Sequence, residues 1–384
     1  MYKKPLFIGP EAGLTSMSDR TPQRAMLDMG MNTGNLLFVR AAMEVLGDGR
    51  GISQARLPGG RRQAPLPAES LEGHDCLVVC AANWLQSRTD FGTLAEIIEA
   101  ADLPTFTLGL GAQAGPSMSI PELTDGTKRF LAVVSERAKS VSVRGAFTAE
   151  VLNHYGAKNA EATGCPSLLM MPSVPPDLVK PARAPKNIVL CGSRGAPAEA
   201  QLTSQMPTHV MSRLFARSLA REDVTFVAQA ELPEINYLIS DLCAPADIRE
   251  EWISFAERYY EMPREDLVPL LMAKMKVFFN FPDWEAFLKG QDFVVGTRLH
   301  GVIAGLLSGT PSVLVTHDSR TVEMAEIMQI PSVPARAVRD RVDYSAIYEA
   351  ADLDLFNARY PEYYRRFRAF FEANDLAHRL DATV

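Results

Sequence analysis

The stretch Asp292-Phe-Val-Val-Gly-Thr-Arg-Leu-His-Gly301 changes character twice within a short length of chain. Its apolar run, Phe293–Gly296, is typical of a strand that is covered on both faces. Three polar side chains follow, and the apolar residues Gly301–Leu307 then predict a buried helix. A strand that passes through a short polar turn into a helix is the repeating unit of parallel α/β sheets. The stretch therefore predicts an α/β fold.

The same alternation extends along most of the chain. Apolar runs that predict buried strands lie at Cys76–Cys80, Thr105–Gly109, Ser140–Val143, Ile188–Cys191, Val224–Ala228, Val277–Asn280, Phe293–Gly296 and Ser312–Thr316. Between them, apolar residues recur at helical spacing, as in Leu94, Ile97 and Ile98. Strands that alternate with helices in this way favour a doubly wound, mostly parallel sheet.

One proline-rich segment interrupts this alternation. Met171–Lys186 holds five prolines, a density that is typical of a stiff linker. We therefore predict an N-terminal α/β domain over residues 1–175, a C-terminal α/β domain over residues 185–340, and a cleft between them. Aromatic residues at helical spacing predict that residues 341–384 form a helical tail that packs on the body.

The composition is that of a globular protein without a basic or membrane-spanning region. Lys and Arg number 39 and Asp and Glu number 46, so the formal net charge is −7. This acidic balance argues against a nucleic-acid partner, and no apolar run approaches the ~20 residues of a membrane span. Five cysteines without the spacing of a disulfide framework or a zinc site indicate a reducing compartment and no metal. We therefore expect a cytoplasmic protein, and the composition leaves its oligomeric state open.

Arg298 and His300 are the residues best suited to chemistry. They follow a predicted strand and precede a predicted helix, where free backbone N–H groups and the positive helix end attract an anion. Arginine adds a planar fork for carboxylate or phosphate, and histidine gives or takes a proton near neutral pH. In an extended strand end the two side chains would point the same way. The alternative is an arginine that pairs with a carboxylate and a histidine that is satisfied in the core.

Further arginines stand at the ends of other predicted strands. Arg144 follows one such strand, and Arg320 follows another. Because parallel strands present their carboxyl ends along one edge of a sheet, these arginines could converge on one anionic ligand. Next to Arg320, Asp318 is a candidate helix N-cap and Glu323 is a candidate first-turn acid.

Glycines and small polar residues mark the other candidates for a cleft lining. A Gly-x-Gly loop follows a predicted strand, but it lacks the lysine and the third glycine of nucleotide-binding loops. Near the N-terminus, Asn35 precedes a helical pattern and is a candidate for capping that helix or for reaching the cleft. The predicted cleft-lining residues are Asn32, Gly34, Asn35, Gly109, Gly111, Thr297 and Asp318.

At these residues the chain resembles the polysaccharide pyruvyl transferase family. The matching pieces are Asn32–Asn35, Gly109–Gly111, Ser142–Arg144, Gly156–Gly164, Gly296–His300, Pro311 and Asp318–Arg320. The resemblance implies a GT-B-like fold in which two Rossmann-like domains face a cleft and the C-terminal domain binds the donor. It implies phosphoenolpyruvate as the donor co-substrate, without a further cofactor, and a sugar diol of a polysaccharide or glycan precursor as the acceptor. The implied products are a pyruvate ketal and phosphate.

The resemblance also implies roles for individual residues. The implied donor-binding residues are Arg298, Leu299 and Arg144, to which the strand-end argument adds Arg320. His300 completes the Arg-Leu-His of the family and is the candidate catalytic acid or base. Where many members carry Gly-Gly-Gly, this chain has Ala81-Ala-Asn-Trp84, and the identity of the acceptor sugar therefore stays open.

Two other functions are compatible with the sequence. The first is a GT-B glycosyltransferase that uses a nucleotide-sugar donor, with Arg320 or Glu323 on the donor. The second is a non-catalytic protein of the same fold that binds a sugar or an anion. The donor that raises the melting temperature separates the two transferases, and release of phosphate in the presence of an acceptor separates both from a binding protein.

Overall fold

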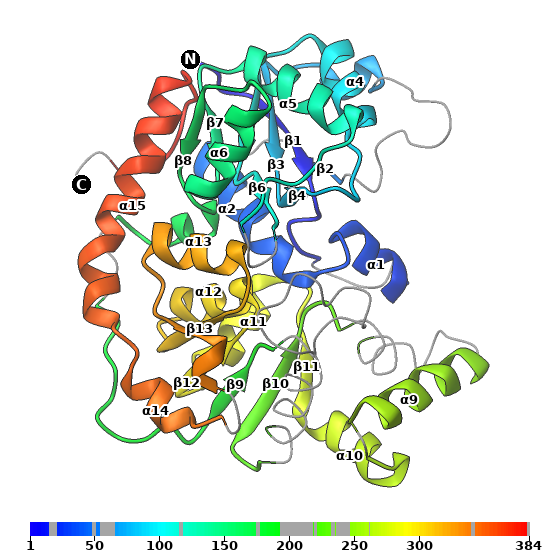
Figure 1. The fold of residues 1–384 in the computed structure, drawn as a ribbon, viewed down its shortest axis with the longest axis vertical. Helices are drawn as coiled ribbons and strands as arrows, with labels where there is room; N and C mark the ends of the chain where they lie inside the picture. Colours follow the sequence, from blue (N-terminus) through cyan, green and yellow to red (C-terminus); the bar gives the residue numbers. More distant parts are fainter. Residues whose placement is uncertain are drawn as a thin grey trace.

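Two parallel sheets form the framework of the protein in its computed structural model (Figure 1). The structure describes residues 1–14, 21–47, 51–53, 66–114, 118–173, 177–192, 218, 221–231, 235, 246–260, 262–338 and 342–381. The four-stranded sheet runs from β2 (Gly51–Ser53) through β1 (Pro5–Gly9) and β3 (Cys76–Cys80) to β5 (Thr105–Leu108). The six-stranded sheet runs from β11 (Met275–Val277) through β10 (Val224–Ala228), β9 (Ile188–Leu190), β12 (Phe293–Gly296) and β13 (Ser312–Thr316) to β14 (Ser332–Pro334).

Two short parallel pairs extend the first half beyond its main sheet. β4 (Asn83–Leu85) pairs with β6 (Gly111–Ala112), and β7 (Val141–Val143) pairs with β8 (Ala160–Ala162). A bridge between Leu110 and Val143 brings β7 beside the loop that follows β5. The end of β7 therefore lies next to the glycines of that loop.

Helices connect the parallel strands, as parallel pairing requires. Those of the first half are α1 (Pro22–Asp28), α2 (Leu36–Leu46), α3 (Ala68–Leu71), α4 (Gly92–Ala101), α5 (Asp125–Arg137) and α6 (Ala146–His154). Those of the second half are α9 (Ala246–Tyr260), α10 (Arg264–Lys274), α11 (Phe281–Leu288), α12 (Leu299–Leu307), α13 (Ser319–Met328), α14 (Tyr344–Glu349) and α15 (Leu353–Ala373). Short 3₁₀ helices lie at η1 (Thr33–Asn35), η3 (Pro166–Met170) and η6 (Ala335–Val338). The predicted α/β class with parallel, Rossmann-like sheets is confirmed.

One of the predicted strands is misplaced. The run Val277–Asn280 predicts a strand, but β11 ends at Val277 and α11 begins at Phe281. The physical reason is local: the side chain of Asn280 accepts a hydrogen bond from the N–H of Asp283 and caps α11, and proline is favoured in such a first turn. The capping signal outweighs the apolar character of the two phenylalanines before it.

One hydrophobic core joins the two halves of the chain. It contains Phe7 and Val78 from the four-stranded sheet and Val189 and Val294 from the six-stranded sheet, together with the buried faces of α2, α12 and α15. Burial of this much apolar surface is the main favourable term in folding. The two sheets thus have separate hydrogen-bond ladders, but side chains from both pack in one hydrophobic core.

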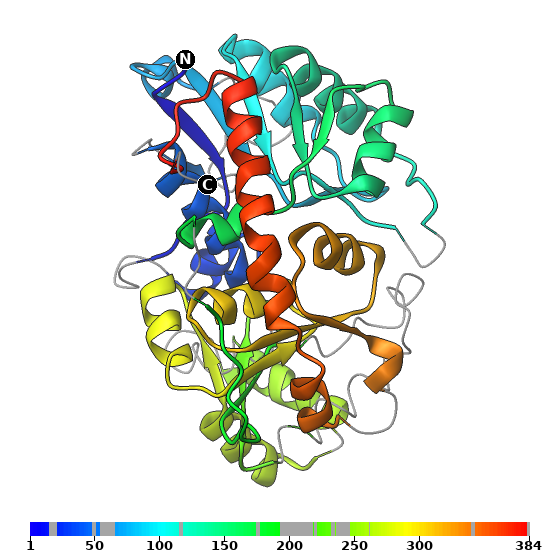
Figure 2. The same ribbon diagram turned by 90° about the vertical axis from the view of Figure 1, so that its left-hand side faces the viewer.

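The aromatic stripe of the C-terminal region faces this shared core. Its buried members are Phe356, Tyr360, Tyr363, Tyr364, Phe367, Phe370 and Phe371. The hydroxyl of Tyr360 donates to the carbonyl of Leu168, and that of Tyr363 donates to the carbonyl of Cys165. Figures 1 and 2 show α15 running beside both halves of the molecule. The domain boundaries at 175, 185 and 340 stay a prediction, and Pro175 and Pro176 lie outside the described residues.

No helix in the described part of the chain combines the length and the apolar character that a membrane crossing needs. The longest of the helices named above, α15, is amphipathic: its aromatic face is buried, while arginines and glutamates such as Arg359, Glu362 and Arg368 pair with each other or with their neighbours at the surface. Its hydrophobic residues are therefore accounted for by packing within the protein.

Candidate functional site

The stretch between β12 and α12 forms a tighter turn than the sequence predicts. β12 ends at Gly296, Arg298 is the N-cap of α12, and His300 already lies in the first helical turn. The expectation of an extended strand end that points Arg298 and His300 the same way is therefore wrong. The reason is the apolar run that begins at Leu299, because it packs as a buried helix from that residue onward.

The guanidinium of Arg298 is anchored by a buried carboxylate. Nε and Nη2 of Arg298 donate to Oε1 of Glu231 at 3.1 and 2.7 Å, and Glu231 is 1% exposed. The other oxygen of Glu231 accepts the backbone N–H groups of Gln229 and Ala230. Arg298 is 25% exposed, and its planar fork carries N–H groups beyond these two bonds. The ion pair fixes the direction of the guanidinium and leaves capacity for a ligand.

Arg144 packs against the loop that contains Gly109 and Gly111. It is buried at the end of β7, and its Nε donates to the carbonyl of Gly109 at 2.9 Å. Its Nη1 donates to Oδ1 of Asn83. A Cβ added at Gly111 would come within 2.6 Å of Arg144 Cδ, so a side chain there would displace the arginine. The carbonyl of Gly109 and the missing side chain of Gly111 thus hold Arg144 in place.

Asn83 is a residue whose role the sequence reasoning missed. It belongs to the stretch Ala81–Trp84, which departs from the glycine-rich pattern named above. The signal was the departure itself: a polar side chain in an otherwise apolar segment that follows β3. The structure shows that this side chain holds the guanidinium of Arg144 from across the sheet edge.

Asp318 and Arg320 form a capped helix start. The carboxylate of Asp318 accepts from the N–H and the hydroxyl of Thr321 at 2.8 Å each, which confirms the predicted N-cap. Arg320 lies 3.2 Å from the same carboxylate. Burial alone would raise the pKa of Asp318, but Arg320, His317 and the Thr321 donors together lower it to about 2. Asp318 is therefore ionised at neutral pH, and it orients Arg320.

Glu323 lies beyond the first turn of α13, so its predicted place there is wrong. It caps a different helix instead. Its Oε1 accepts the backbone N–H of Thr148 at 2.9 Å, and its Oε2 accepts the Thr148 hydroxyl at 3.1 Å. Gly145 is the N-cap of α6 and has no side chain to fill this role. A Cβ at Gly145 would come within 2.6 Å of Glu323 Cδ. The carboxylate thus fastens the second half of the chain to the start of α6.

Glu323→Ala should lower the free energy of unfolding by about 1–2 kcal/mol, the usual cost of losing a helix cap. Glu323→Gln keeps an acceptor for Thr148 and removes a buried charge, so its stability at neutral pH should equal or exceed that of the parent. Burial raises the pKa of Glu323, although the Thr148 bonds oppose this shift. The parent should therefore lose stability as pH rises through that raised pKa, whereas Glu323→Gln should not. Urea unfolding at acidic and neutral pH measures both effects, and equal stability of all three proteins would contradict this role.

His300 is buried in the first turn of α12, within electrostatic range of Arg144 and Arg320. It is 7% exposed, and its ring packs against Phe38 with centroids 5.5 Å apart. Its Nε2 lies 3.6 Å from Sγ of Cys165. Burial, followed by the charges of Arg144 and Arg320, lowers the pKa of His300 to about 3. The imidazole is therefore neutral at neutral pH.

The N-terminal segment Asn32–Asn35 packs closely against His300. A Cβ at Gly34 would come within 2.8 Å of His300 Cβ, so a glycine is needed at the contact. Asn32 Oδ1 accepts the N–H of Gly34 at 3.0 Å and caps the short helix η1. Asn35 neither caps α2 nor donates across to His300; its Nδ2 donates to the carbonyl of Met29. The capping role expected for Asn35 is therefore wrong, since Asn32 supplies the cap one turn earlier.

We call the group Arg144, Arg298, His300, His317, Asp318 and Arg320 the arginine–histidine cluster. Its members act on one another electrostatically: Arg144 and Arg320 on His300, and Asp318, Arg320 and Arg298 on His317. Leu299 and Thr297 are buried beside the cluster in the β12–α12 connection. The structure thus brings together arginines from both halves of the chain.

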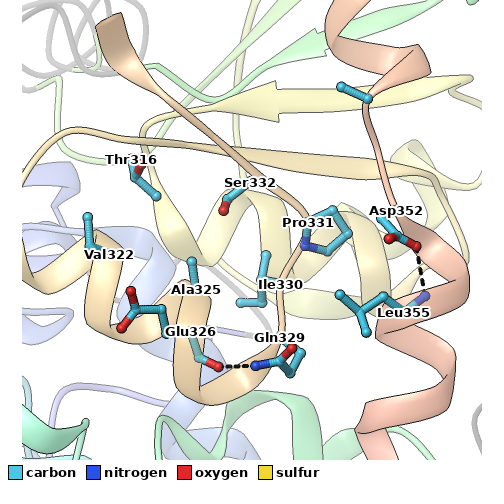
Figure 3. Close-up of a pocket in the computed structure, with 11 residues that line it drawn as sticks. Thr316, Val322, Ala325, Glu326, Gln329, Ile330, Pro331, Ser332, Asp352 and Leu355 are labelled. Atoms are coloured by element: carbon cyan, nitrogen blue, oxygen red, sulfur yellow. Dashed lines mark hydrogen bonds between the residues drawn. The ribbon is translucent and has the colours of Figure 1, made fainter. Parts of the chain in front are cut away.

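A surface pocket lies apart from the cluster. It has a volume of about 340 Å³. Its lining includes Glu326 of α13, Gln329 directly after that helix, Pro331 and Ser332 of the β14 region, and Asp352 before α15. Figure 3 shows the side chain of Gln329 turned back onto the carbonyl of Glu326. Members of the arginine–histidine cluster are not part of this lining. Among the described residues, no group of three or more His, Cys, Asp or Glu side chains is placed to hold a metal ion.

Comparison with known proteins identifies the class of this chain. The sequence pattern described as polysaccharide pyruvyl transferase matches residues 14–319, which include every member of the cluster except Arg320. The chain belongs to the polysaccharide pyruvyl transferase family and is a transferase. No curated protein matches it.

Several solved structures are similar over the whole length of the chain. A putative UDP-N-acetylglucosamine 2-epimerase from Listeria monocytogenes is 12% identical, with 100% of both chains covered and a TM-score of 0.45. Anabaena HepE in complex with UDP and glucose is 13% identical, with 98% of this chain and 100% of that chain covered and a TM-score of 0.44. S. aureus MnaA with UDP is 12% identical, with 97% and 98% covered and a TM-score of 0.43.

Proposed function

We propose that the protein transfers the enolpyruvyl group of phosphoenolpyruvate to two hydroxyls of a sugar, forming a pyruvate ketal and releasing phosphate. The observation that carries the proposal is that Arg144, just before α6, and Arg320, at the start of α13, come from opposite halves of the chain and are brought near each other by the contact of Glu323 with Thr148. Both arginines act electrostatically on His300. Phosphoenolpyruvate has a carboxylate and a phosphate, and arginines are suited to bind both groups. Membership of the family supports a sugar or glycan as the acceptor.

The reaction that we propose has two additions at one carbon. A proton adds to the methylene carbon of phosphoenolpyruvate, and the cationic centre at C2 is attacked by the first sugar hydroxyl, which loses its proton. The bond from C2 to the phosphate oxygen then breaks, and the departing phosphate takes up one of the protons released by the hydroxyls. The second hydroxyl attacks C2 and loses its proton, which closes the ketal. The net products are the ketal and inorganic phosphate. The chain supplies positive charge for the anion and a group that moves a proton.

His300 is the proposed proton-transfer residue. In the free protein burial and two arginines keep its pKa low, so it starts as the neutral base. A bound anion offsets the charge of Arg144 and Arg320 and so reverses their part of the lowering of the His300 pKa, whereas burial, the larger cause, remains.

The donor is tested by calorimetry with phosphoenolpyruvate and, separately, with a UDP-sugar. A donor at about 100 times its Kd should add about 2.7 kcal/mol to the free energy of unfolding and raise the melting temperature. Phosphate release in the presence of a panel of diol-bearing glycans then tests the transfer. Stabilisation by the UDP-sugar alone would instead favour a glycosyltransferase, and binding of phosphoenolpyruvate without phosphate release from any glycan would favour a binding protein.

Arg298→Ala should weaken phosphoenolpyruvate binding by about 1.5–3 kcal/mol, the value of a charge-assisted hydrogen bond. Unlike an isolated surface arginine, Arg298 also neutralises the buried Glu231, so the variant should lose about 1–3 kcal/mol of stability. The double variant Arg298→Ala/Glu231→Gln should recover stability without recovering binding. Calorimetry and urea unfolding measure the two effects separately. A folded Arg298→Ala protein with parental donor affinity would remove Arg298 from the proposed donor site.

A further inference from the structure

The side-chain nitrogen of Gln229 is buried without a hydrogen-bond partner among the described residues, close to His300 of the arginine–histidine cluster. Gln229 directly follows β10 and is 1% exposed. Its backbone is fully used, because its carbonyl accepts the N–H of Thr33 at 2.9 Å and its N–H donates to Glu231. Its Nε2, however, has no hydrogen-bond partner among the described residues. A buried amide that is left unpaired costs stability, so such a group points to a ligand that completes it.

Two glycines place the amide against the first turn of α12. A Cβ at Gly301, which neighbours His300 in that turn, would come within 2.7 Å of Gln229 Nε2. A Cβ at Gly34, from the opposite half of the chain, would overlap Gln229 Oε1. The carboxamide therefore lies between η1 and α12, at the level of His300. The absence of side chains at both glycines is what allows it to lie there.

The first backbone N–H groups of α12 receive no hydrogen-bond acceptor from the side chain of the N-cap residue. Its N-cap is Arg298, whose side chain makes no capping hydrogen bond. The first N–H groups of a helix carry partial positive charge and readily bind an anion. Two more buried polar atoms, Thr33 Oγ1 and Arg320 Nε, also lack partners within the part of the chain that the structure describes. These unpartnered groups come from both halves of the chain, and Gln229 Nε2 lies against the first turn of α12, so an oxygen-rich anion at that helix end matches the amide.

We propose that Gln229 is a donor-site residue whose carboxamide N–H donates to an oxygen of phosphoenolpyruvate at the amino end of α12. The inference rests on the proposed function and extends it to a residue outside the Arg-Leu-His segment. Gln229 and Arg298 are linked through Glu231, which accepts the Gln229 backbone N–H on one oxygen and the Arg298 guanidinium on the other. The carboxylate of Glu231 therefore fixes the positions of Gln229 and Arg298, the two residues that we propose to donate hydrogen bonds to phosphoenolpyruvate.

Three variants test the role of Gln229. Gln229→Glu keeps the shape and replaces the N–H donor by a carboxylate oxygen, whereas Gln229→Met removes the polar group without adding charge. Gln329→Glu is the matched control, because it makes the same charge change in the pocket of Figure 3, away from the cluster. Calorimetry with phosphoenolpyruvate, inorganic phosphate and pyruvate measures binding, and thermal unfolding without ligand measures stability.

Gln229→Glu should bind phosphoenolpyruvate at least about tenfold more weakly than the parent, and Gln329→Glu should bind it as the parent does. Gln229→Met should also bind more weakly, yet its melting temperature should equal or exceed that of the parent, since it removes an unpaired buried amide. A structural amide would behave in the opposite way, with a lower melting temperature and unchanged binding. Loss of inorganic phosphate binding assigns the contact to the phosphate, and loss of pyruvate binding assigns it to the carboxylate.

Each failure has its own signature. If the parent binds phosphoenolpyruvate and both Gln229 variants bind it equally well, the role of Gln229 is overturned while the proposed function stands. If the parent binds inorganic phosphate but not phosphoenolpyruvate, and Gln229→Glu loses the phosphate, Gln229 is an anion-binding residue and the proposed donor is overturned. If the parent binds none of the three anions, both proposals are overturned. Gln229→Met decides the question if Gln229→Glu does not fold.

Discussion

His300→Asn is expected to bind phosphoenolpyruvate within a few-fold of the parent and to lose turnover by about 10²–10⁴-fold, the usual contribution of a positioned acid or base. Asparagine can keep a hydrogen bond beside Cys165, but it cannot carry a proton at neutral pH. Loss of turnover without loss of binding is the signature of an interaction made mainly in the transition state. Phosphate release with the acceptor found in the glycan screen, together with calorimetry, measures the two quantities. His154→Asn, on the exposed end of α6, is the matched control.

The pH dependence of stability gives this prediction a second readout. The folded-state pKa of His300 is about 3, below the ordinary value of 6.5. The stability that depends on neutral His300 is therefore complete above about pH 6.5 and is lost as pH falls from there toward the folded-state pKa. His300→Asn should lack this part of the acid-induced loss. Near-parental turnover in His300→Asn would reduce His300 to a donor-positioning residue, and failure of the variant to fold would make it a core histidine.

Gly296→Ala is expected to lower the free energy of unfolding by about 3 kcal/mol or more, at the upper end for overpacking in a close-packed core. A Cβ at Gly296 would overlap the carbonyl group of Cys191 and come within 3.0 Å of its Cα. These are backbone atoms beside the neighbouring strand β9, so no side-chain rotation relieves the overlap. The Cys191 carbonyl also accepts the N–H of Arg298 at 3.0 Å, and its displacement should weaken donor binding as well.

The control for this substitution is Gly290→Ala. A Cβ there meets only the carbonyl oxygen of Phe287, at an ordinary 3.6 Å. We expect its stability to stay within about 0.5 kcal/mol of the parent, as for most surface changes. Urea unfolding of the two variants side by side measures the difference. Equal stability of Gly296→Ala and Gly290→Ala would contradict this prediction. It would show that the backbone at Cys191 can shift to accept a Cβ at position 296 without a large loss of stability.

The sequence predicts those site residues that follow a strand or precede a helix. Arg144, Arg298 and Arg320 each follow a strand, and Asp318 precedes a helix in the pattern of an N-cap. Gln229 and Glu231 obey the same strand-end rule after β10, and a more uniform use of it would have found them. His317 was visible in the sequence beside Asp318, but nothing local shows that it interacts with Arg298 from the neighbouring strand end.

The sequence by itself determined the strand–turn–helix units. The spacing of apolar residues, the helix-capping residues and the glycines at turns each depend only on residues that are neighbours in the chain. Cys76–Cys80, Val224–Ala228, Phe293–Gly296 and Ser312–Thr316 form strands at their predicted bounds for this reason. Only the tertiary structure decided the partners of the charged groups. Asn83 meets Arg144 across 61 residues, Glu231 meets Arg298 across 67, and Glu323 meets Thr148 across 175. Strand order in the six-stranded sheet brings Glu231 and Arg298 together, and the strand pairs of the first half bring Asn83 to Arg144. The contact of Glu323 with Thr148 depends instead on how the two halves pack, and both kinds of arrangement are properties of the whole chain.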